Sequence, residues 1–418
     1  MKILAAWLIP AYCLLAVPHA EAWEKYGIHS SYPAAISVQI NPSKISDQQL
    51  AAIKDAGFEY VRFGQRPPVN DNTQDFSELL DRLRKAQLKP LITLFGGATV
   101  WEQPKRMMPA TMTPLDAADK FSRFALDTMQ QHKDPDILWE LWNEPDISRF
   151  LKPDMLQTAL VPAIQKICAA LEQDKSPVKK NVFGFGFAKM PNLQDNAPTN
   201  KLLAISVQDC LSGVSVHPYR AVPETVVGDA ANTRQLLEKY GKGELPMIAS
   251  EWGYSNFAPV RDQDGQAQLV LREYLSTIMA GIPLLNIYQW QDTGTNRTDR
   301  EQNFGLSDSA GQAKLVLPAL KHLLSTLKDT QLADSRQVGE SYQLTLNSQP
   351  GAKVKRSVHV VWNNSLRSEG SLPIARNGAR RCVIRQFYPQ QSETACPSDV
   401  DAINLTIGPV PVAVTLYY

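Results

Sequence analysis

Hydrophobic positions between about residue 24 and residue 328 follow an alternating pattern. Short runs of apolar, β-branched or aromatic residues are separated by longer amphipathic stretches. In the stretch 46–56, Leu50, Ile53 and Ala56 lie three residues apart, the spacing of one helical face. A second stretch of this kind covers 76–86. The pattern predicts repeated βα units, with strands at 26–29, 58–64, 91–96, 137–143, 181–187, 214–219, 247–252 and 284–290.

Eight βα units in one chain segment predict a (β/α)8 barrel. A doubly wound sheet is the alternative, but it would place a glycine-rich phosphate turn after an early strand. The nearest sequence is Gly184-Phe185-Gly186, which lacks a third glycine and lies inside a predicted strand. We therefore interpret these glycines as packing residues. The barrel is expected to cover residues 23–330.

The pattern changes after about Asp329, where alternating strands follow one another without clear helices. The strand candidates are 341–346, 357–362, 381–388 and 404–416. They predict a small all-β, sandwich-like domain at residues 331–418. This domain either binds ligand or packs on the barrel for stability, and the second interpretation is favoured.

The first 22 residues have the pattern of a signal peptide. A basic start is followed by the apolar run 3–17 and by the small-x-small motif at 20–22. An apolar core of about 15 residues is shorter than the roughly 20 that span a bilayer. Lipidation of Cys13 is disfavoured because the bulky Tyr12 precedes it. We expect cleavage before Trp23 and export to the periplasm or the medium, with no membrane span in the mature chain.

Composition narrows the class of partner. The 418 residues are 44% hydrophobic and carry 43 Lys and Arg against 42 Asp and Glu, a formal net charge of +1. This composition excludes a disordered chain, and the absence of a basic run argues against a nucleic-acid partner. The sequence does not predict an oligomeric state.

Four cysteines remain after the predicted cleavage. Cys382 and Cys396 lie in one short stretch and are expected to form a disulfide, whereas Cys168 and Cys210 are predicted to be buried thiols. The chain has no C-x-x-C or H-E-x-x-H motif, and its six histidines are scattered. We therefore expect no metal site and no cofactor.

Two glutamates stand at the ends of predicted strands, each beside tryptophan. The fourth strand ends in the run 139–146, which contains Glu140, Trp142 and Glu144, and the seventh ends at Glu251. Because strand residues alternate between faces, Glu140, Trp142 and Glu144 share one face, with Glu144 at the mouth and Glu140 deeper and buried. Glu251 lies 107 residues after Glu144, about three βα units on, so the two carboxylates are expected to face each other across the barrel.

Two facing carboxylates are the chemistry that glycosidic bond cleavage requires, since one acid protonates the leaving oxygen and the other attacks or activates water. Indole faces suit sugar rings, and Trp142, Trp252 and Trp290 all fall at predicted strand ends. These tryptophans are candidates to line a substrate cleft. Plain core packing remains the alternative for each of them.

The run 139–146, with Asn143-Glu144-Pro145 at its centre, and the later Ser250-Glu251 resemble the acid/base and nucleophile signatures of the retaining glycoside hydrolases of clan A. The sequence is most similar to glycoside hydrolase family 39. The resemblance covers residues 24–328, and 409–416 is similar to that family's closing β domain. It implies that Glu144 is the general acid/base and Glu251 a nucleophile that forms a covalent glycosyl-enzyme intermediate.

The same resemblance implies supporting roles. Asn143 would hold the substrate's 2-hydroxyl. The sequence His217-Pro218-Tyr219 resembles the clan's H-x-Y motif, whose tyrosine hydrogen-bonds the nucleophile, and Arg62 resembles the arginine that keeps it ionised. A buried polar pair is the alternative for His217 and Tyr219, and a salt bridge at the bottom of the barrel is the alternative for Arg62.

Substrate identity depends on loops that the resemblance does not reach. The polar segments 99–113 and 291–303 are either subsite walls or solvated connections, and His29 either contacts substrate or lies in the core or on the surface. We expect double-displacement hydrolysis of a poly- or oligosaccharide. The alternatives are an exo-acting glycosidase on small glycosides, of the β-xylosidase type, and a non-catalytic carbohydrate-binding barrel.

Overall fold

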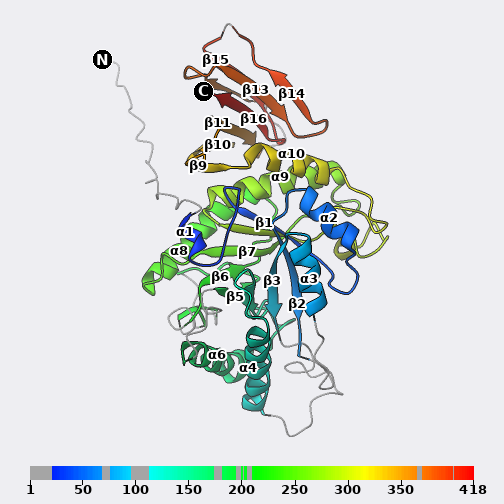
Figure 1. Ribbon diagram of the computed structural model, residues 1–418, viewed down its shortest axis with the longest axis vertical. Helices are drawn as coiled ribbons and strands as arrows, with labels where there is room; N and C mark the ends of the chain where they lie inside the picture. Colours follow the sequence, from blue (N-terminus) through cyan, green and yellow to red (C-terminus); the bar gives the residue numbers. More distant parts are fainter. Residues whose placement is uncertain are drawn as a thin grey trace, which may run out of the picture.

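The structure is a computed structural model (Figure 1). It describes residues 21–67, 76–95, 113–173, 181–193, 199–200, 202–204, 210–364, 370–398 and 400–418. The predicted leader therefore lies outside the described residues, apart from its last two positions. Across the described ranges, no helix has both the length and the apolar character needed to cross a bilayer.

Eight parallel strands form a closed barrel in which each strand pairs with the next along the chain and the last pairs with the first. This arrangement confirms the predicted (β/α)8 barrel. The strands are β1 Ala35–Gln39, β2 Tyr60–Gln65, β3 Lys89–Leu94, β4 Leu138–Leu141, β5 Val182–Phe187, β6 Gly213–Val216, β7 Met247–Trp252 and β8 Leu284–Ile287.

The first strand is not where the sequence placed it. The segment 26–29 is not a strand, and β1 begins only at Ala35. Trp23 and Ile28 instead pack against residues at the amino-terminal ends of the barrel strands, including Tyr60 and Leu138. The apolar residues that suggested a strand therefore close the bottom of the barrel.

Helices cover the outside of the barrel, and their sequences explain where they begin. In α2, Ser46 accepts a hydrogen bond from the backbone N–H of Gln49 in a capping box, and Leu50 and Ile53 are buried. Both helices expected at 46–56 and 76–86 are confirmed. The helices are α1 Glu21–Glu24, α2 Asp47–Asp55, α3 Ser77–Lys85, α4 Pro114–Gln131, α5 Pro153–Met155, η1 Leu156–Leu160, α6 Val161–Gln173, η3 Pro223–Thr225, α8 Val226–Lys239, α9 Gln263–Met279, η4 Arg300–Gln302 and α10 Val316–Leu327.

The carboxyl-terminal part is all-β, as predicted. A six-stranded antiparallel sheet has the order β14-β13-β16-β11-β10-β9, and β12 pairs with β15 in a separate ribbon. The single strand expected at 404–416 is wrong, because Pro409 and Pro411 cannot donate to a ladder and the chain breaks there. The strands are β9 Thr330–Val338, β10 Ser341–Ser348, β11 Arg356–Asn363, β12 Gly370–Ala375, β13 Arg381–Gln386, β14 Ser392–Ala395, β15 Ala402–Ile407 and β16 Val412–Tyr417.

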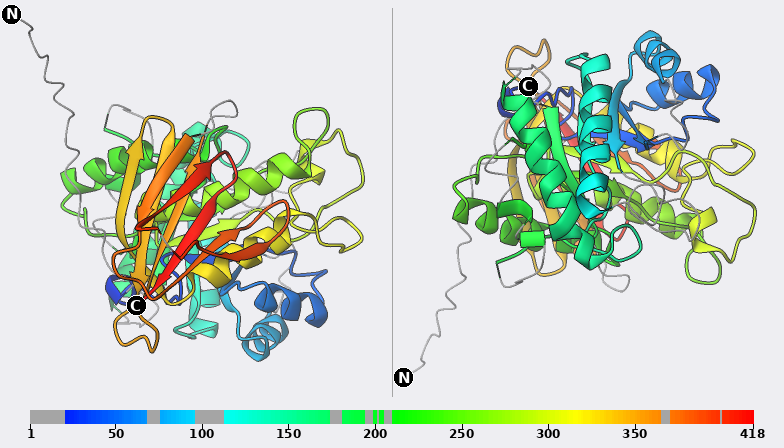
Figure 2. Two further views of the ribbon diagram at one scale, coloured as in Figure 1. Left: turned by 90° about the horizontal axis from the view of Figure 1, so that it is seen from above. Right: turned by 90° about the horizontal axis from the view of Figure 1, so that it is seen from below.

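This sheet lies over α9 and α10 of the barrel (Figures 1 and 2). Alternate residues of β11, such as Val360 and Trp362, join the barrel's hydrophobic core, whereas Val361 faces the β12–β15 ribbon. At the contact, the Glu224 carboxylate accepts hydrogen bonds from Arg272 (2.7 and 2.8 Å) and from the Trp362 indole N–H (2.7 Å). We call these three residues the seam, and they join the sheet to the barrel.

Two disulfides are present among the described residues. Cys382 and Cys396 are bonded, as predicted. The prediction of two free buried thiols is wrong, because Cys168 on α6 is bonded to Cys210 just before β6. Their Cα atoms are 5.1 Å apart, within the range that a disulfide spans. The barrel brings together two cysteines that are 42 positions apart in sequence.

Candidate active site

An irregularity in β7 directs Glu251 into the barrel mouth. Ala249 pairs with Leu285 and Trp252 pairs with Ile287, so β7 has one more residue than β8 over this interval. Such a bulge leaves one residue unpaired and changes the direction of side chains. Strict alternation would have placed Glu251 on the outer face with Ala249; instead its side chain is 18% exposed and lines a pocket.

Two donors hold the Glu251 carboxylate. The Tyr219 hydroxyl donates to Oε1 (2.9 Å) and the Arg62 guanidinium to Oε2 (2.8 Å). Burial alone would raise the pKa of Glu251, but the nearby His217 and Arg62 and these hydrogen bonds outweigh it and hold the pKa below its usual value. Glu251 is therefore an anion at neutral pH.

Glu144 reaches the same space from a turn rather than from a strand. β4 ends at Leu141, and Trp142 and Glu144 both have positive φ angles, which turn the chain inward over the barrel. The backbone N–H of Glu144 donates to the Gly186 carbonyl (3.1 Å), which fixes this turn against β5. The Glu144 carboxylate lies 2.8 Å from Nδ1 of His217, whose ring is fully buried.

Glu140 lies beneath these groups and is fully buried, as its strand position predicted. Its Oε2 accepts hydrogen bonds from Arg62 (2.7 and 3.1 Å) and from the Thr93 hydroxyl (2.6 Å). Burial would raise its pKa, but Arg62 and His217 lower it to about 2. Arg62 thus stands between two glutamates near the carboxyl ends of the strands, not in a salt bridge at the bottom of the barrel.

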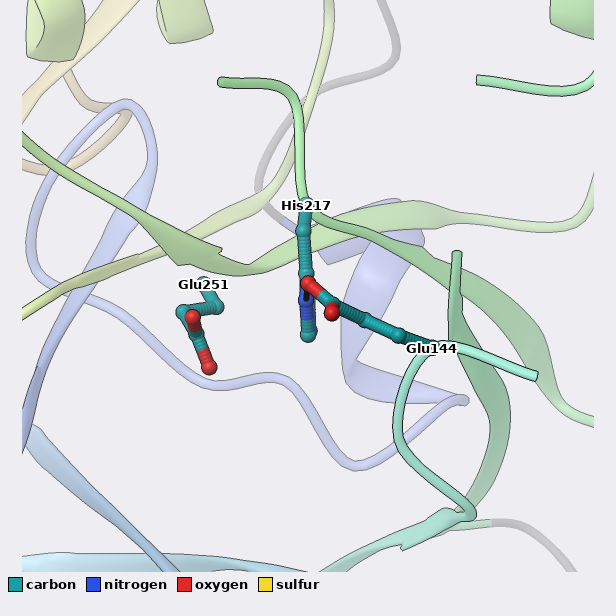
Figure 3. Close-up of side chains that lie close together, drawn as sticks. All are labelled: Glu144, His217 and Glu251. Atoms are coloured by element: carbon teal, nitrogen blue, oxygen red, sulfur yellow. Dashed lines mark hydrogen bonds and ion pairs between the residues drawn. The ribbon is translucent and has the colours of Figure 1, made fainter. Parts of the chain in front are cut away.

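The glutamates at 144 and 251 face each other (Figure 3). One carboxylate oxygen of each and one ring nitrogen of His217 lie within 4.8 Å of one another. These three groups also form the donor set best suited to a metal among the described residues. However, Arg62 and Tyr219 already bind the Glu251 carboxylate, and one face of the Glu144 carboxylate contacts His217. The arrangement is that of two carboxyl groups that face each other across a gap.

A pocket of about 450 Å³ opens above the two carboxylates. It is large enough for part of an oligosaccharide, and it mixes polar groups with aromatic rings. The side chains named for the site by sequence that line it are Arg62, Asn143, Glu144, Tyr219 and Glu251; the further lining residues are Gln39, Gly64, Thr93, Phe95, Arg149, Phe150, Ala188, Tyr288, Arg300, Glu301 and Phe304.

Solved structures with this architecture include several glycoside hydrolases. A family 39 glycoside hydrolase from Bacteroides cellulosilyticus superposes with a TM-score of 0.71 at 19% identity, over 92% of this chain and 81% of that one. A GH39 enzyme from Xanthomonas axonopodis gives 0.61 at 15% identity, over 92% and 94%. The chain has the fold of family 39 glycoside hydrolases.

A glucosidase from Croceicoccus marinus gives a TM-score of 0.63 at 12% identity, over 93% of this chain and 96% of that one. No protein-family model matches the sequence, and a comparison with curated proteins finds no match. The structure therefore confirms the fold that the resemblance implied, although overall sequence similarity is too low to give a match.

The three tryptophans do not line the pocket. Trp142 packs edge-on against Phe121 of α4 with ring centroids 5.0 Å apart, because the chain leaves β4 before it. Trp252 pairs beyond the β7 bulge and so faces the helices. Trp290 packs against Phe58. The core-packing alternative therefore describes their positions, and the cleft interpretation is wrong.

His29 lies at the opposite end of the barrel. Its backbone N–H donates to the hydroxyl of Tyr60, the first residue of β2, and its half-exposed ring is 3.9 Å from Glu24. Because parallel strands begin at that end, His29 cannot contact a substrate at the mouth. The possible substrate contact proposed for this residue is wrong.

Of the five aromatic residues that line the pocket, all but Tyr219 were missed by sequence reasoning. Tyr288 directly follows the last residue of β8. Its position at a strand end could have identified it, but Trp290 was chosen from the same segment instead. Phe95 likewise follows β3. Phe150 and Phe304 lie in loops, where no periodicity marks them.

The two segments named as possible subsite walls have different outcomes. The segment 99–113 lies outside the described residues, apart from Thr113, which caps α4. In the segment 291–303, Arg300 and Glu301 line the pocket. Asp292 instead forms a buried ion pair with Lys314 (2.7 Å), so this part of the loop is structural.

Proposed function

We propose that this protein is a retaining glycoside hydrolase that cleaves O-glycosidic bonds of a poly- or oligosaccharide. The observation that carries the proposal is the close approach of the Glu144 and Glu251 carboxylates, whose oxygens come within 4.8 Å. Retaining enzymes hold their carboxyl groups about 5–5.5 Å apart, whereas inverting enzymes separate them by roughly 6.5–9.5 Å to admit water. Glycoside hydrolases among the structures of this fold support the same reaction class.

In the first step, the Glu251 oxygen attacks the anomeric carbon while Glu144 gives its proton to the departing oxygen. The charge that makes Glu251 a nucleophile is maintained by Arg62 and Tyr219. Burial and the Glu251 charge raise the pKa of Tyr219 well above its usual value, so its hydroxyl keeps the proton that it donates.

In the second step, Glu144 accepts a proton from water, which attacks the glycosyl ester and releases Glu251. Formation of the ester removes the charge on Glu251, so an ionised Glu144 no longer faces a second anion. His217, at 2.8 Å, holds the Glu144 carboxylate in place for both steps. Asn143 accepts a hydrogen bond from Arg62 through Oδ1 (3.0 Å), which leaves its amide N–H groups to donate to a 2-hydroxyl.

The configuration of the first-formed product tests this proposal. Two displacements at the same carbon retain the anomeric configuration, and proton NMR of early products of an aryl glycoside measures it before mutarotation. A retained anomer is expected. An inverted anomer would reject the two-step mechanism, and no turnover of any aryl or polymeric glycoside would favour a non-catalytic carbohydrate-binding barrel.

We also propose that the protein is exported to the periplasm or the medium. The leader-like pattern of residues 1–22 supports this location. The two disulfides support it as well, because such bonds persist in oxidising compartments. Sequencing the amino terminus of the mature protein tests the proposal, with Trp23 as the expected first residue.

A further inference from the structure

Three arginines surround the pocket mouth in the same way. Arg66 lies over the ring of Phe95 (4.4 Å from guanidinium carbon to ring centroid). Arg149 lies over Phe150 (5.4 Å), and Arg300 over Phe304 (5.1 Å). All three phenylalanines line the pocket. A guanidinium stacked on an aromatic face keeps its N–H groups free at the edges and loses less conformational freedom when it binds.

These arginines come from three separate loops. Arg66 follows β2, Arg149 lies in the turn after β4, and Arg300 lies in the long loop after β8. In the closed barrel, β2 lies two strands from β8 on one side and two strands from β4 on the other. The three arginines are therefore spread over one half of the mouth. Glu144 comes from the β4 end and Glu251 from β7. A chain bound across the two glutamates would therefore pass beside the arginines.

The arginines that line the pocket differ in how far their charges are compensated by ion pairs. Arg62 is already shared by two glutamates, so it offers no free charge. Arg300 has only a loose contact with Glu301, at 3.6 Å, and both side chains are more than half exposed. Arg149 lines the pocket and has no ion-pair partner among the described residues.

Free guanidinium groups bind planar oxyanions through paired hydrogen bonds, and carboxylates fit this geometry. We propose that the pocket takes an acidic glycan, in which uronic acid residues next to the cleaved bond place their carboxylates against Arg149 and Arg300, with Arg66 at the rim. This inference rests on the proposed function for its reaction but not for its binding. It narrows the substrate class to saccharides that carry carboxylate groups.

Binding measurements on matched saccharides test the inference apart from catalysis. The probes are oligogalacturonides, glucuronoxylan oligosaccharides and alginate oligosaccharides, each compared with its carboxyl-reduced, neutral counterpart. The protein is the full chain with Glu144→Gln, which copies the protonated acid and slows cleavage during calorimetry. At least one acidic probe is expected to bind about tenfold more tightly than its neutral partner, and this preference should weaken as salt is raised.

Arginine variants identify the groups responsible. The double substitution Arg149→Gln and Arg300→Gln should remove the preference, with each change contributing about a few-fold to tenfold. Arg336→Gln is the matched control, because this arginine is 70% exposed on β9, in the β domain. It removes the same charge as either single substitution, Arg149→Gln or Arg300→Gln, and should leave the preference intact. Unchanged thermal unfolding of all variants verifies folding.

Two results would overturn the inference. Equal or tighter binding of the neutral partners across the panel would show that the pocket does not select charge. A preference that survives the double substitution would assign it to other groups. Failure of the proposed function has a different signature, since the wild-type protein would then bind the acidic probe with the expected preference and release no product from it.

Discussion

The barrel mouth and the seam each bury an arginine against glutamate, but they differ in the number of charges. At the seam, Arg272 meets Glu224 alone, both side chains are almost fully buried, and Trp362 adds a third hydrogen bond. At the mouth, Arg62 serves both Glu140 and Glu251, so one negative charge remains in excess. Breaking a balanced buried pair is costly because it leaves an uncompensated charge. A buried ion pair with equal charges stabilises the fold, whereas the extra carboxylate charge at the mouth suits the proposed reaction.

The largest effect expected from breaking the comparison is at the mouth. Glu251→Ala should lower kcat/KM by about 10⁴-fold or more, because the proposed nucleophile is lost. The free energy of unfolding should not fall, since Arg62 keeps Glu140 and the excess charge disappears. Turnover of an aryl glycoside and urea unfolding measure the two effects. Added azide should restore part of the activity and give a glycosyl azide of inverted configuration. Activity near that of the wild type would disprove the assignment of the nucleophile.

Glu144→Ala should have the next largest effect, and one that depends on the leaving group. Substrates with poor leaving groups are expected to lose about 10²- to 10⁴-fold in rate, whereas the first step with an activated aryl glycoside should be nearly spared. A series of aryl glycosides of graded phenol acidity measures this.

Equal losses on good and poor leaving groups would mean that another acid protonates the leaving oxygen. The remaining acids near the site have other partners. Asp146 accepts hydrogen bonds from the backbone N–H groups of Ala188 and Lys189, and Asp292 is paired with Lys314. A double variant, Glu144→Ala with Asp146→Asn, would then separate the two candidates.

At the seam, the effect should be on stability alone. Glu224→Ala leaves Arg272 buried without a partner and is expected to cost about 3–5 kcal/mol in free energy of unfolding. Trp362→Phe removes only one hydrogen bond and should cost about 1 kcal/mol beyond the change in packing. Denaturant unfolding measures both, while kcat at a temperature where each variant is folded should stay near wild type. A loss of kcat without a loss of stability would show that the seam acts on the mouth.

A smaller effect than that of Glu224→Ala is expected at Glu273 on α9, a buried glutamate that has no arginine partner among the described residues. Neither of its carboxylate oxygens has a hydrogen-bond partner among the described residues, and burial raises its pKa well above the usual value. The folded protein therefore holds this proton to higher pH than the unfolded chain. Its stabilising contribution is complete below the unfolded pKa and is lost as pH rises through the folded pKa.

Glu273→Leu should therefore stabilise the protein more at pH 8 than at pH 5, by about 1–2 kcal/mol between the two. Urea unfolding at both pH values measures the difference, and Glu273→Gln is the neutral control of similar shape. A gain that is the same at both pH values would show that the carboxyl group does not titrate in this range.

Much of the fold and the two central carboxylates were predictable, because parallel barrels place reacting groups at strand ends. Glu144 and Glu251 come together in the structure, and so do His217, Tyr219 and Arg62. The wrong position predicted for the first strand, β1, has a physical cause. An apolar run such as 26–29 is equally suited to a strand or to the plug that closes the barrel, and hydrophobicity alone does not separate them.

The tryptophans failed for a related reason. Alternation predicts a face only while a strand is regular, and β4 ends before Trp142 while β7 bulges before Trp252. The Cys168–Cys210 disulfide depends on the approach of α6 to the start of β6, which no local spacing reveals. The sequence named the segment 291–303 as a possible subsite wall, but only the folded structure shows that Arg300 within it, and Arg149 in another loop, line the pocket.

Because of the bulge, the direction of the Glu251 side chain depends on the number of residues in β7 rather than on which side chains they carry. Between Ala249 and Trp252 the strand has one residue more than β8 needs. Deleting Ser250 would leave the glutamate as the single residue between Ala249 and Trp252 and would return the strand to regular pairing. By alternation, its carboxylate would then take the inward position of Ser250, one residue deeper than the place where Arg62 and Tyr219 hold it. Insertions and deletions of single residues in this strand are therefore more damaging than most substitutions, and any alignment of related chains must allow a gap here before it compares their glutamates.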